Sequence, residues 1–356
     1  METICFISSN NANCNQSSVQ NLQDICRSVI LEKITLKNIQ QVADLPLPQI
    51  LKEFIGTFHI DKDFNLDGIY EEYNFNFPNH VHHKAHQIHP AKCVINGENV
   101  LLRYQSIEDC TMCNNVGILT PRSEETREKW AYLRHDNLMQ CHLRMYDQEK
   151  NVSFSVLDFP IINLEDLVIR TFVERKQIPE MLIWDTVVKL SSVLQYLTEK
   201  DIYPWELCQP RHVVVGINGN VMLENMLLYL PVKSDAPYQI ETCARLSNYT
   251  SPEQLKGQPL SPKTLIWGLG CIINELALLF PTSLQRTENL KLVLPSSAKT
   301  RSPALRKLIQ HCLQEDFRCR PMLKEVEIIA KLELNKATKL YGKYEGNLLS
   351  VYTSHN

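Results

Sequence analysis

Histidine and cysteine, the side chains that most often bind zinc, are concentrated in one part of this chain. Five histidines fall within ten residues, followed by one cysteine: His80, His82, His83, His86, His89 and Cys93. A Cys-x-x-Cys pair stands further on, at Cys110 and Cys113. Structural zinc sites use paired ligands at regular spacings. Only one such pair is present and the histidine spacings fit no standard finger, so we predict an exposed loop without a bound metal; a zinc site is the alternative.

The composition allows a sizeable core and excludes several classes of protein. Of 356 residues, 44% are apolar and 22% are charged, which suits one large domain and a smaller one. The net charge of −3 gives no electrostatic basis for binding nucleic acid or an anionic membrane. No apolar run approaches the roughly 18 residues that span a bilayer, and the first residues do not resemble a secretory signal. The 12 cysteines are therefore expected to be reduced thiols, in the cytoplasm or nucleus.

Strand patterns come early in the chain and helical patterns come late. Short apolar runs typical of strands lie at 99–104, 152–159, 212–215 and 221–223. Long helical patterns lie at 181–199, 264–279, 303–313 and 322–336. This order predicts an α+β fold with a small β-rich N-terminal lobe and a helical C-terminal lobe.

Residues 19–58 have a helical pattern of their own. Leu22, Cys26 and Ile30 recur at every fourth position and so share one side of a helix. A second short pattern follows, and the Leu-Pro-Leu-Pro at 45–48 leads into a third helix. Three short helices over about 40 residues cannot bury this apolar surface alone. They must pack against the rest of the chain or against a partner.

Two motifs in this segment resemble the SOCS box. The spacing Leu-x-x-x-Cys-x-x-x-aliphatic at Leu22, Cys26 and Ile30 is similar to its elongin-C-binding pattern. The family's cullin-contacting Leu-Pro-x-Pro is matched by Leu45, Pro46, Leu47 and Pro48. The resemblance implies that Leu22 inserts into a pocket on elongin C with Cys26 beside it, and that the proline motif helps to select the cullin. In the family this box usually ends a chain, whereas here it precedes the larger domain.

The larger region resembles the C-lobe of protein kinases, especially NIMA-related kinases. Tyr-Thr-Ser-Pro-Glu-Gln at 249–254 precedes Leu-Ile-Trp-Gly-Leu-Gly-Cys at 265–271, and Cys-Leu-x-x-Asp-x-x-x-Arg-Pro follows at 312–321. In kinases the Glu of the first motif and the Arg of the last form a buried ion pair. Here these residues are Glu253 and Arg320, and the resemblance implies a bilobal kinase-like fold with this pair as a structural lock.

The residues that carry phosphoryl transfer in kinases are altered in this chain. No glycine-rich loop is present, and Arg103 stands where the phosphate-binding lysine would be. Glu206 takes the position of the catalytic Asp, Arg211 or His212 that of a magnesium-binding Asn, and Asn225 that of the Asp in Asp-Phe-Gly. Because the reaction relies on metal ions and positioned charges, the resemblance implies a pseudokinase without catalytic residues. No cofactor is expected, and whether ATP binds stays open.

These assignments divide the chain into five parts. They are a disordered N-terminus at 1–18, the SOCS box at 19–58, a His/Asn-rich linker at 59–94, the kinase-like domain at 95–336 and a tail at 337–356. We expect a non-catalytic adaptor that binds elongin B/C and a cullin and presents an unidentified protein for ubiquitination. The alternatives are an atypical Ser/Thr kinase that uses Arg103 and Glu206, and a scaffold that regulates a true kinase while its N-terminal helices pack internally.

Overall fold

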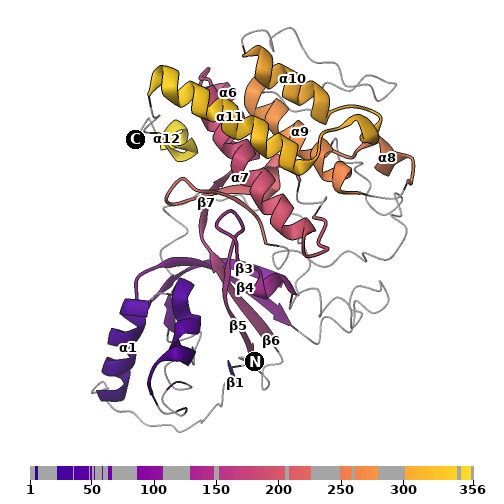
Figure 1. Cartoon of the computed structure of the whole chain (residues 1–356). Helices are drawn as coiled ribbons and strands as arrows, with labels where there is room; N and C mark the ends of the chain where they lie inside the picture. The colour runs from indigo at the N-terminus through magenta and orange to yellow at the C-terminus, as the bar shows by residue number, and fades with distance from the viewer. Residues whose placement is uncertain are drawn as a thin grey trace. The chain divides into compact units, whose positions relative to one another are not determined.

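A computed structural model of the chain describes most of its residues. They are 5–6, 22–34, 36–47, 49, 52, 58, 63–65, 86–106, 129–147, 152–204, 208–225, 249–258, 261–279, 301–342 and 346–353. The chain divides into two compact units (Figure 1). The first unit comprises Met1–Arg134, Gln140–Phe159 and Asn225–Lys233, and the second comprises His135–Met139, Pro160–Glu224 and Ser234–Asn356.

The first unit is built on a six-stranded sheet with the strand order β1-β5-β6-β4-β3-β2. The strands are β1 (Cys5–Phe6), β2 (Phe64–Asn65), β3 (His86–Cys93), β4 (Asn99–Ser106), β5 (Cys141–Asp147) and β6 (Val152–Asp158). Neighbouring strands are antiparallel, except that β1 and β5 are parallel. In β4, Val100, Leu101 and Leu102 are all buried, which shows that both faces of the sheet are covered here.

Two helices of the N-terminal segment, α1 (Leu22–Ile34) and η1 (Leu36–Asp44), pack against one face of this sheet (Figure 1). The element η1 is a 3₁₀-helix, at the place where the sequence predicted a second short helix. Its apolar residues Leu36, Ile39 and Val42 are spaced by three, and side chains at that spacing line up in a helix of three residues per turn. All three are buried in the core shared with the sheet. Gln49 and Lys52 are also helical, and the rest of the predicted third helix lies outside the described residues.

The second unit is mainly helical and carries a small sheet with the order β7-β8-β9. Its strands are β7 (Pro160–Asn163), β8 (Val213–Gly216) and β9 (Val221–Leu223). Its helices are α6 (Leu164–Val173), α7 (Glu180–Thr198), η4 (Pro210–His212), α8 (Pro252–Leu255), α9 (Pro262–Leu278), α10 (Pro303–Cys312), η8 (Phe317–Cys319), α11 (Leu323–Tyr341) and α12 (Leu348–Thr353). The mixed fold, with a β-rich first unit and a helical second unit, is the predicted one. None of the described helices is long and apolar enough to cross a bilayer.

Three helices of the second unit begin at a Ser-Pro pair. Ser251, Ser261 and Ser302 each precede a proline in the first turn of α8, α9 and α10. Each serine hydroxyl accepts a hydrogen bond from a backbone N–H of that turn, at 3.2–3.3 Å. The first N–H groups of a helix have no partner within the helix, so proline, which lacks this group, is favourable at the first position. The serine hydroxyl accepts a hydrogen bond from another of these N–H groups, which would otherwise be unpaired. These short sequences therefore set where the three helices start.

Two glycines let other segments approach helix α9 closely. A Cβ atom on Gly268 would lie 2.5 Å from the Cβ atom of Cys208, and one on Gly270 would lie 2.7 Å from that of Cys312. Real Cβ atoms do not approach so closely, so any larger residue would push these segments apart. Helix α9 is buried along almost its whole length and forms the centre of the unit.

Candidate functional site

The inner face of α1 belongs to the core of the first unit. Leu31 is 3% exposed there, and Ile30 and Ile34 lie half-buried against the same apolar cluster. Ile30, the third residue of the predicted elongin-binding stripe, thus contributes to internal packing. It lies at the border between the inner and outer faces of the helix.

The outer face of α1 carries an exposed apolar residue that the sequence motif did not single out. Val29 is 52% exposed. At 100° per residue, positions 22 and 26 lie within about 60° of position 29 around the helix axis. We call Leu22, Cys26 and Val29 the outer face of α1. The side chains of Leu22 and Cys26 lie outside the described part, so the structure places them by their helical positions alone.

A largely buried ion pair fastens α1 to the residues that follow the N-terminal segment. Arg27 donates two hydrogen bonds to Asp63, from Nη1 to Oδ1 at 3.0 Å and from Nη2 to Oδ2 at 3.1 Å. Its guanidinium also lies 5.0 Å from the ring centroid of Phe58. Backbone of the same region reaches the sheet, because the N–H of Val94 donates to the Asp63 carbonyl at 2.8 Å. The planar guanidinium group can donate paired hydrogen bonds to a carboxylate and also pack against an aromatic ring.

The proline motif forms a tight turn at the surface. The N–H of Leu47 donates to the carbonyl of Leu45 at 2.8 Å, which leaves Pro46 at the tip. Pro46 is exposed, whereas Leu45 and Leu47 are half-buried and pack against the apolar cluster. Pro48 lies outside the described residues. The motif therefore presents Pro46 outward and uses its two leucines as anchors.

In the first unit, two residues that were predicted to occupy catalytic positions of kinases are buried. Arg103 lies in the middle of β4, paired across the sheet with Ser155, and is 4% exposed. Side chains alternate along a strand, so Arg103 lies on the face opposite to Leu102, which packs toward α1 and η1. Asn225 is fully buried, and its side-chain amide donates to the carbonyl of Trp130 at 3.3 Å.

In the second unit, His212, one of two residues predicted at the position of a magnesium-binding Asn, contacts a carboxylate. His212 Nδ1 and Glu224 Oε2 lie 2.9 Å apart, and both side chains are largely buried. The N–H of Glu224 also donates to the carbonyl of His212 at 2.9 Å. The sequence motif did not identify Glu224; its signal was a lone acidic residue at the end of an apolar strand. Glu206 lies outside the described residues.

A zinc site was the alternative interpretation of the histidine-rich stretch. Within the part of the chain that the structure describes, no group of three or more His, Cys, Asp and Glu side chains is arranged to hold a metal ion. The histidine-rich stretch and the Cys-x-x-Cys pair lie outside that part, apart from the backbone of β3 and Cys93. Burial raises the pKa of Cys141, Cys208 and Cys312 to about 12, so these thiols stay protonated and unreactive near neutral pH.

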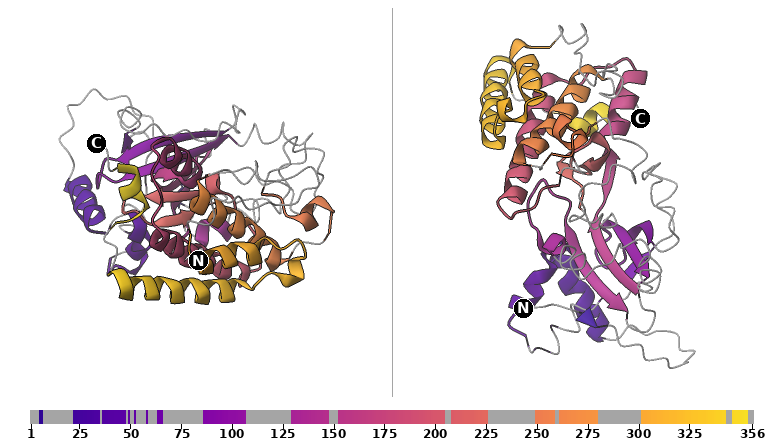
Figure 2. Two further views of the ribbon diagram at one scale, coloured as in Figure 1. Left: turned by 90° about the horizontal axis from the view of Figure 1, so that it is seen from above. Right: turned by 90° about the vertical axis from the view of Figure 1, so that its right-hand side faces the viewer.

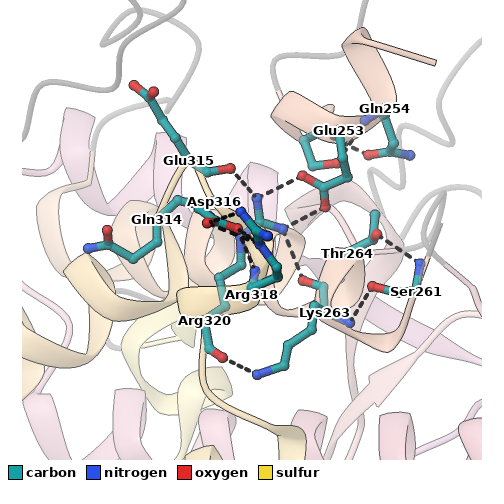
Figure 3. A network of polar contacts seen from close by, with 11 residues as sticks. Glu253, Gln254, Ser261, Lys263, Thr264, Gln314, Glu315, Asp316, Arg318 and Arg320 are labelled. Atoms are coloured by element: carbon teal, nitrogen blue, oxygen red, sulfur yellow. Dashed lines mark hydrogen bonds and ion pairs between the residues drawn. The ribbon is translucent and has the colours of Figure 1, made fainter. Parts of the chain in front are cut away.

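The predicted lock residues lie together in the second unit (Figure 3). Arg320 donates to Glu253 from Nη1 at 2.6 Å and from Nη2 at 2.8 Å, and the two side chains are 0% and 2% exposed. The guanidinium also donates to backbone carbonyls of Gln314 at 2.9 Å and Lys263 at 3.1 Å. It lies 5.0 Å from the ring of Trp267. Arg320 thereby links α8, α9 and the segment that precedes α11.

The charge of Arg320 controls the ionisation of Glu253. Burial alone would raise the pKa of this carboxyl group. The hydrogen bonds and positive charge of Arg320 outweigh that effect, so the pKa of Glu253 lies below its ordinary value. Glu253 is therefore ionised at neutral pH. Removal of either one would leave the other charge buried without its partner.

Comparison with known proteins shows that the larger domain is kinase-like. "Probable serine/threonine-protein kinase nek2" of Dictyostelium discoideum is 26% identical over 160 residues, or 42% of this chain and 36% of that protein. "Serine/threonine-protein kinase D1044.8" of Caenorhabditis elegans is 28% identical over 203 residues, or 54% of this chain and 20% of that protein. "MAP kinase kinase MKK1/SSP32" of Saccharomyces cerevisiae is 26% identical over 194 residues, or 49% and 37%. The chain thus spans between a fifth and just over a third of the length of these relatives.

The N-terminal segment matches the family model of the SOCS box at residues 18–55. The chain therefore joins a SOCS box to a protein-kinase-like domain, as the two sets of motifs predicted. The match covers α1, η1 and the proline turn, whose inner sides pack against the sheet of the first unit.

Proposed function

We propose that this protein is a non-catalytic adaptor of an elongin B/C–cullin ubiquitin ligase. In this role the SOCS box binds elongin B/C and the cullin, and the kinase-like domain binds the protein to be ubiquitinated. The observation that carries the proposal is the SOCS box at residues 18–55. We propose that the SOCS box comprises residues 19–58 and that the kinase-like domain comprises residues 95–336.

The two faces of α1 support elongin binding without local unfolding. Arg27 and Leu31 hold the inner face against the rest of the first unit. Leu22, Cys26 and Val29 lie on the outer face, and Val29 is exposed. We propose that Leu22 and Cys26 enter elongin C, that Val29 extends this contact, and that Ile30 contributes mainly through the position of the helix.

The exposed tip of the proline turn supports a role in cullin binding. Leu45 and Leu47 pack inward and fix the turn, while Pro46 is exposed. A rigid turn needs little ordering when a partner binds, because proline already restricts the backbone. We propose that Pro46 and Pro48 contact the cullin and that the two leucines act by shaping the turn.

The replaced kinase residues support a binding role for the larger domain. Kinases need carboxylate or amide ligands for magnesium and a lysine for the phosphates. Here His212 contacts Glu224, Asn225 donates to a backbone carbonyl, and Arg103 replaces the lysine. We propose that the domain is a pseudokinase in which Glu253 and Arg320 maintain the fold while the catalytic groups have been replaced.

Co-purification with elongin B/C tests this function. The full chain is co-expressed with elongin B and elongin C and captured through a tag on the chain. We expect elongin to be retained by the wild type and lost with Leu22→Asp plus Cys26→Asp, because buried carboxylates oppose an apolar contact. Val29→Asp is expected to reduce retention as well. The matched control is Val94→Asp at an exposed valine in the β3–β4 turn. No elongin with the wild type would refute the adaptor role.

A further inference from the structure

Helix α11 carries apolar residues on two sides, and only one of these sides faces the core. Leu323, Val326 and Ala330 are buried, and the helix packs along α7. Figure 2 shows α11 at the outside of the helical unit. The side away from α7 carries three exposed aliphatic residues, Ile328, Ile329 and Leu332, at 49%, 36% and 54% exposure.

These aliphatic residues lie between charges of opposite sign. Glu325 stands four residues before Ile329, and Lys336 stands four residues after Leu332. At 100° per residue, these four positions fall within about 60° of one another around the helix axis. We call Glu325, Ile328, Ile329, Leu332 and Lys336 the α11 stripe. Its order is acidic, apolar and basic along the helix.

We propose that the α11 stripe is a dimer interface that binds α11 of a second copy of this chain in antiparallel orientation. A twofold axis midway between Ala330 and Lys331 brings Glu325 opposite the partner's Lys336. The same axis brings Ile329 opposite the partner's Leu332. One register thus pairs both charges of the stripe and two of its three apolar residues, Ile329 and Leu332, and each contact occurs twice, as an isologous interface requires.

A groove beside the stripe fits the same register. It has a volume of about 510 Å³ and is lined by His311, Cys319, Arg320, Pro321, Glu325, Ile328 and Ile329. In the antiparallel register the partner's Leu340 comes opposite Pro321, at the apolar side of this groove. Leu340 is 75% exposed in the single chain, so its burial there removes apolar surface from water.

The charges of the stripe favour a second copy over an unrelated partner. Contacts within α11 hold both charged side chains in place. Glu325 accepts a hydrogen bond from the N–H of Met322 at 2.7 Å, and Lys336 contacts Glu333 at 2.6 Å. A partner of one charge sign would meet a like charge at one end of the stripe. A second α11 meets opposite charges at both ends. Because one helix pair is a small interface, we expect a weak dimer that forms with rising concentration.

Charge-swapped variants test this interface by sedimentation velocity on the full chain over a wide range of concentration. The wild type is expected to show a reversible monomer–dimer equilibrium. Glu325→Lys and Lys336→Glu are each expected to be monomeric, because each places like charges opposite one another. A mixture of the two variants is expected to form a heterodimer. This recovery distinguishes charge repulsion at the interface from damage to the helix start. The Glu325→Lys chain lacks the Glu325 cap in the heterodimer too, and it is still expected to bind there.

A second pair of variants tests the apolar part. Leu332→Glu is expected to raise the dimer dissociation constant by about tenfold or more. Val173→Glu, at an exposed valine in α6, is the matched control and leaves the constant unchanged. A wild type that stays monomeric, or a dimer that none of the α11 variants weakens, overturns the proposal. So does a mixture of the charge variants that remains monomeric.

Discussion

Among single residues, Arg320 makes the most testable contribution to the fold. Its guanidinium contacts Glu253 and two backbone carbonyls while it is fully buried. We predict that Glu253→Ala lowers the free energy of unfolding by about 3–5 kcal/mol, because it leaves a buried cation without its partner. Urea unfolding measures this loss. The control is Arg318→Ala, which removes a 78% exposed arginine paired with Asp316 and is expected to change stability little. Equal effects of the two changes would contradict the lock.

The ionisation of Glu253 makes the stability of this lock depend on pH. The folded state lowers the pKa of Glu253, so the ionised form is favoured by folding. The contribution of the pair is complete above the ordinary glutamate pKa of about 4.3 and is lost as pH falls through the lower folded value. We predict that the stability difference between the wild type and Glu253→Gln shrinks in this acidic range. Urea unfolding at several pH values measures it, and a constant difference would show that Glu253 does not titrate as inferred.

At the scale of elements, the close packing of α9 depends on a missing side chain. An added Cβ at Gly268 meets the Cys208 Cβ at 2.5 Å and the Cys208 carbonyl oxygen at 2.7 Å. We predict that Gly268→Ala destabilises the protein by about 1–3 kcal/mol, since backbone must move to relieve the contact. Gly216→Ala is the control, because its nearest neighbour is the flexible end of Met222 at 3.1 Å. Thermal unfolding of both variants measures the two losses, and an equal loss for Gly216→Ala and Gly268→Ala would contradict the close packing at Gly268.

Local patterns predicted elements well where one face is apolar. The periodicity of 181–199 and 264–279 matches α7 and α9 closely, and the strand at 99–104 matches β4. The spacing of three in Leu36, Ile39 and Val42 is equally compatible with an α-helix until the packing is known, so the 3₁₀ form of η1 was missed. Helix α11 runs past the predicted end at residue 336. Leu340 and Tyr341, the apolar residues of its last turn, are exposed and do not continue the buried apolar face.

Side-chain partners distant in sequence were not predictable from one chain. Arg27 and Asp63 are 36 residues apart, and Asp63 stands in a stretch assigned as linker. His212 and Glu224 meet because β8 and β9 form a hairpin. No sequence motif indicated that these two residues are in contact. Glu253 and Arg320 were expected together only through the resemblance to kinases. Their contact distances and burial come from the structure.

For the molecule as a whole, the SOCS box and the sheet of the first unit share one core. We predict that Asp63→Ala loosens α1, because it removes the partner of the largely buried Arg27, at a cost of about 1–3 kcal/mol. Hydrogen exchange of residues 22–34 is expected to become faster than in the wild type. Asp185→Ala, which removes an exposed carboxylate paired with Lys189 on α7, serves as the control. Unchanged exchange in α1 would show that the ion pair does not fasten the helix.

The kinase-like domain is expected to lack metal-assisted nucleotide binding. By the correspondence that the kinase motifs imply, Arg103 replaces the lysine, Arg211 or His212 replaces one magnesium ligand and Asn225 replaces the other. We therefore expect the groups that hold the metal–nucleotide complex to be lacking. We predict that ATP with magnesium or manganese produces no rise in melting temperature beyond that seen with ATP alone. A clear metal-dependent rise would favour an atypical kinase that uses Arg103 and Glu206.

The adaptor role is tested most directly by calorimetric titration of purified elongin B/C with the full chain. We predict saturable binding by the wild type, no measurable binding by Leu22→Asp plus Cys26→Asp, and wild-type binding by Val94→Asp. Absence of binding by the wild type, or equal binding by the double variant, would contradict the assignment of α1 as the elongin-binding helix.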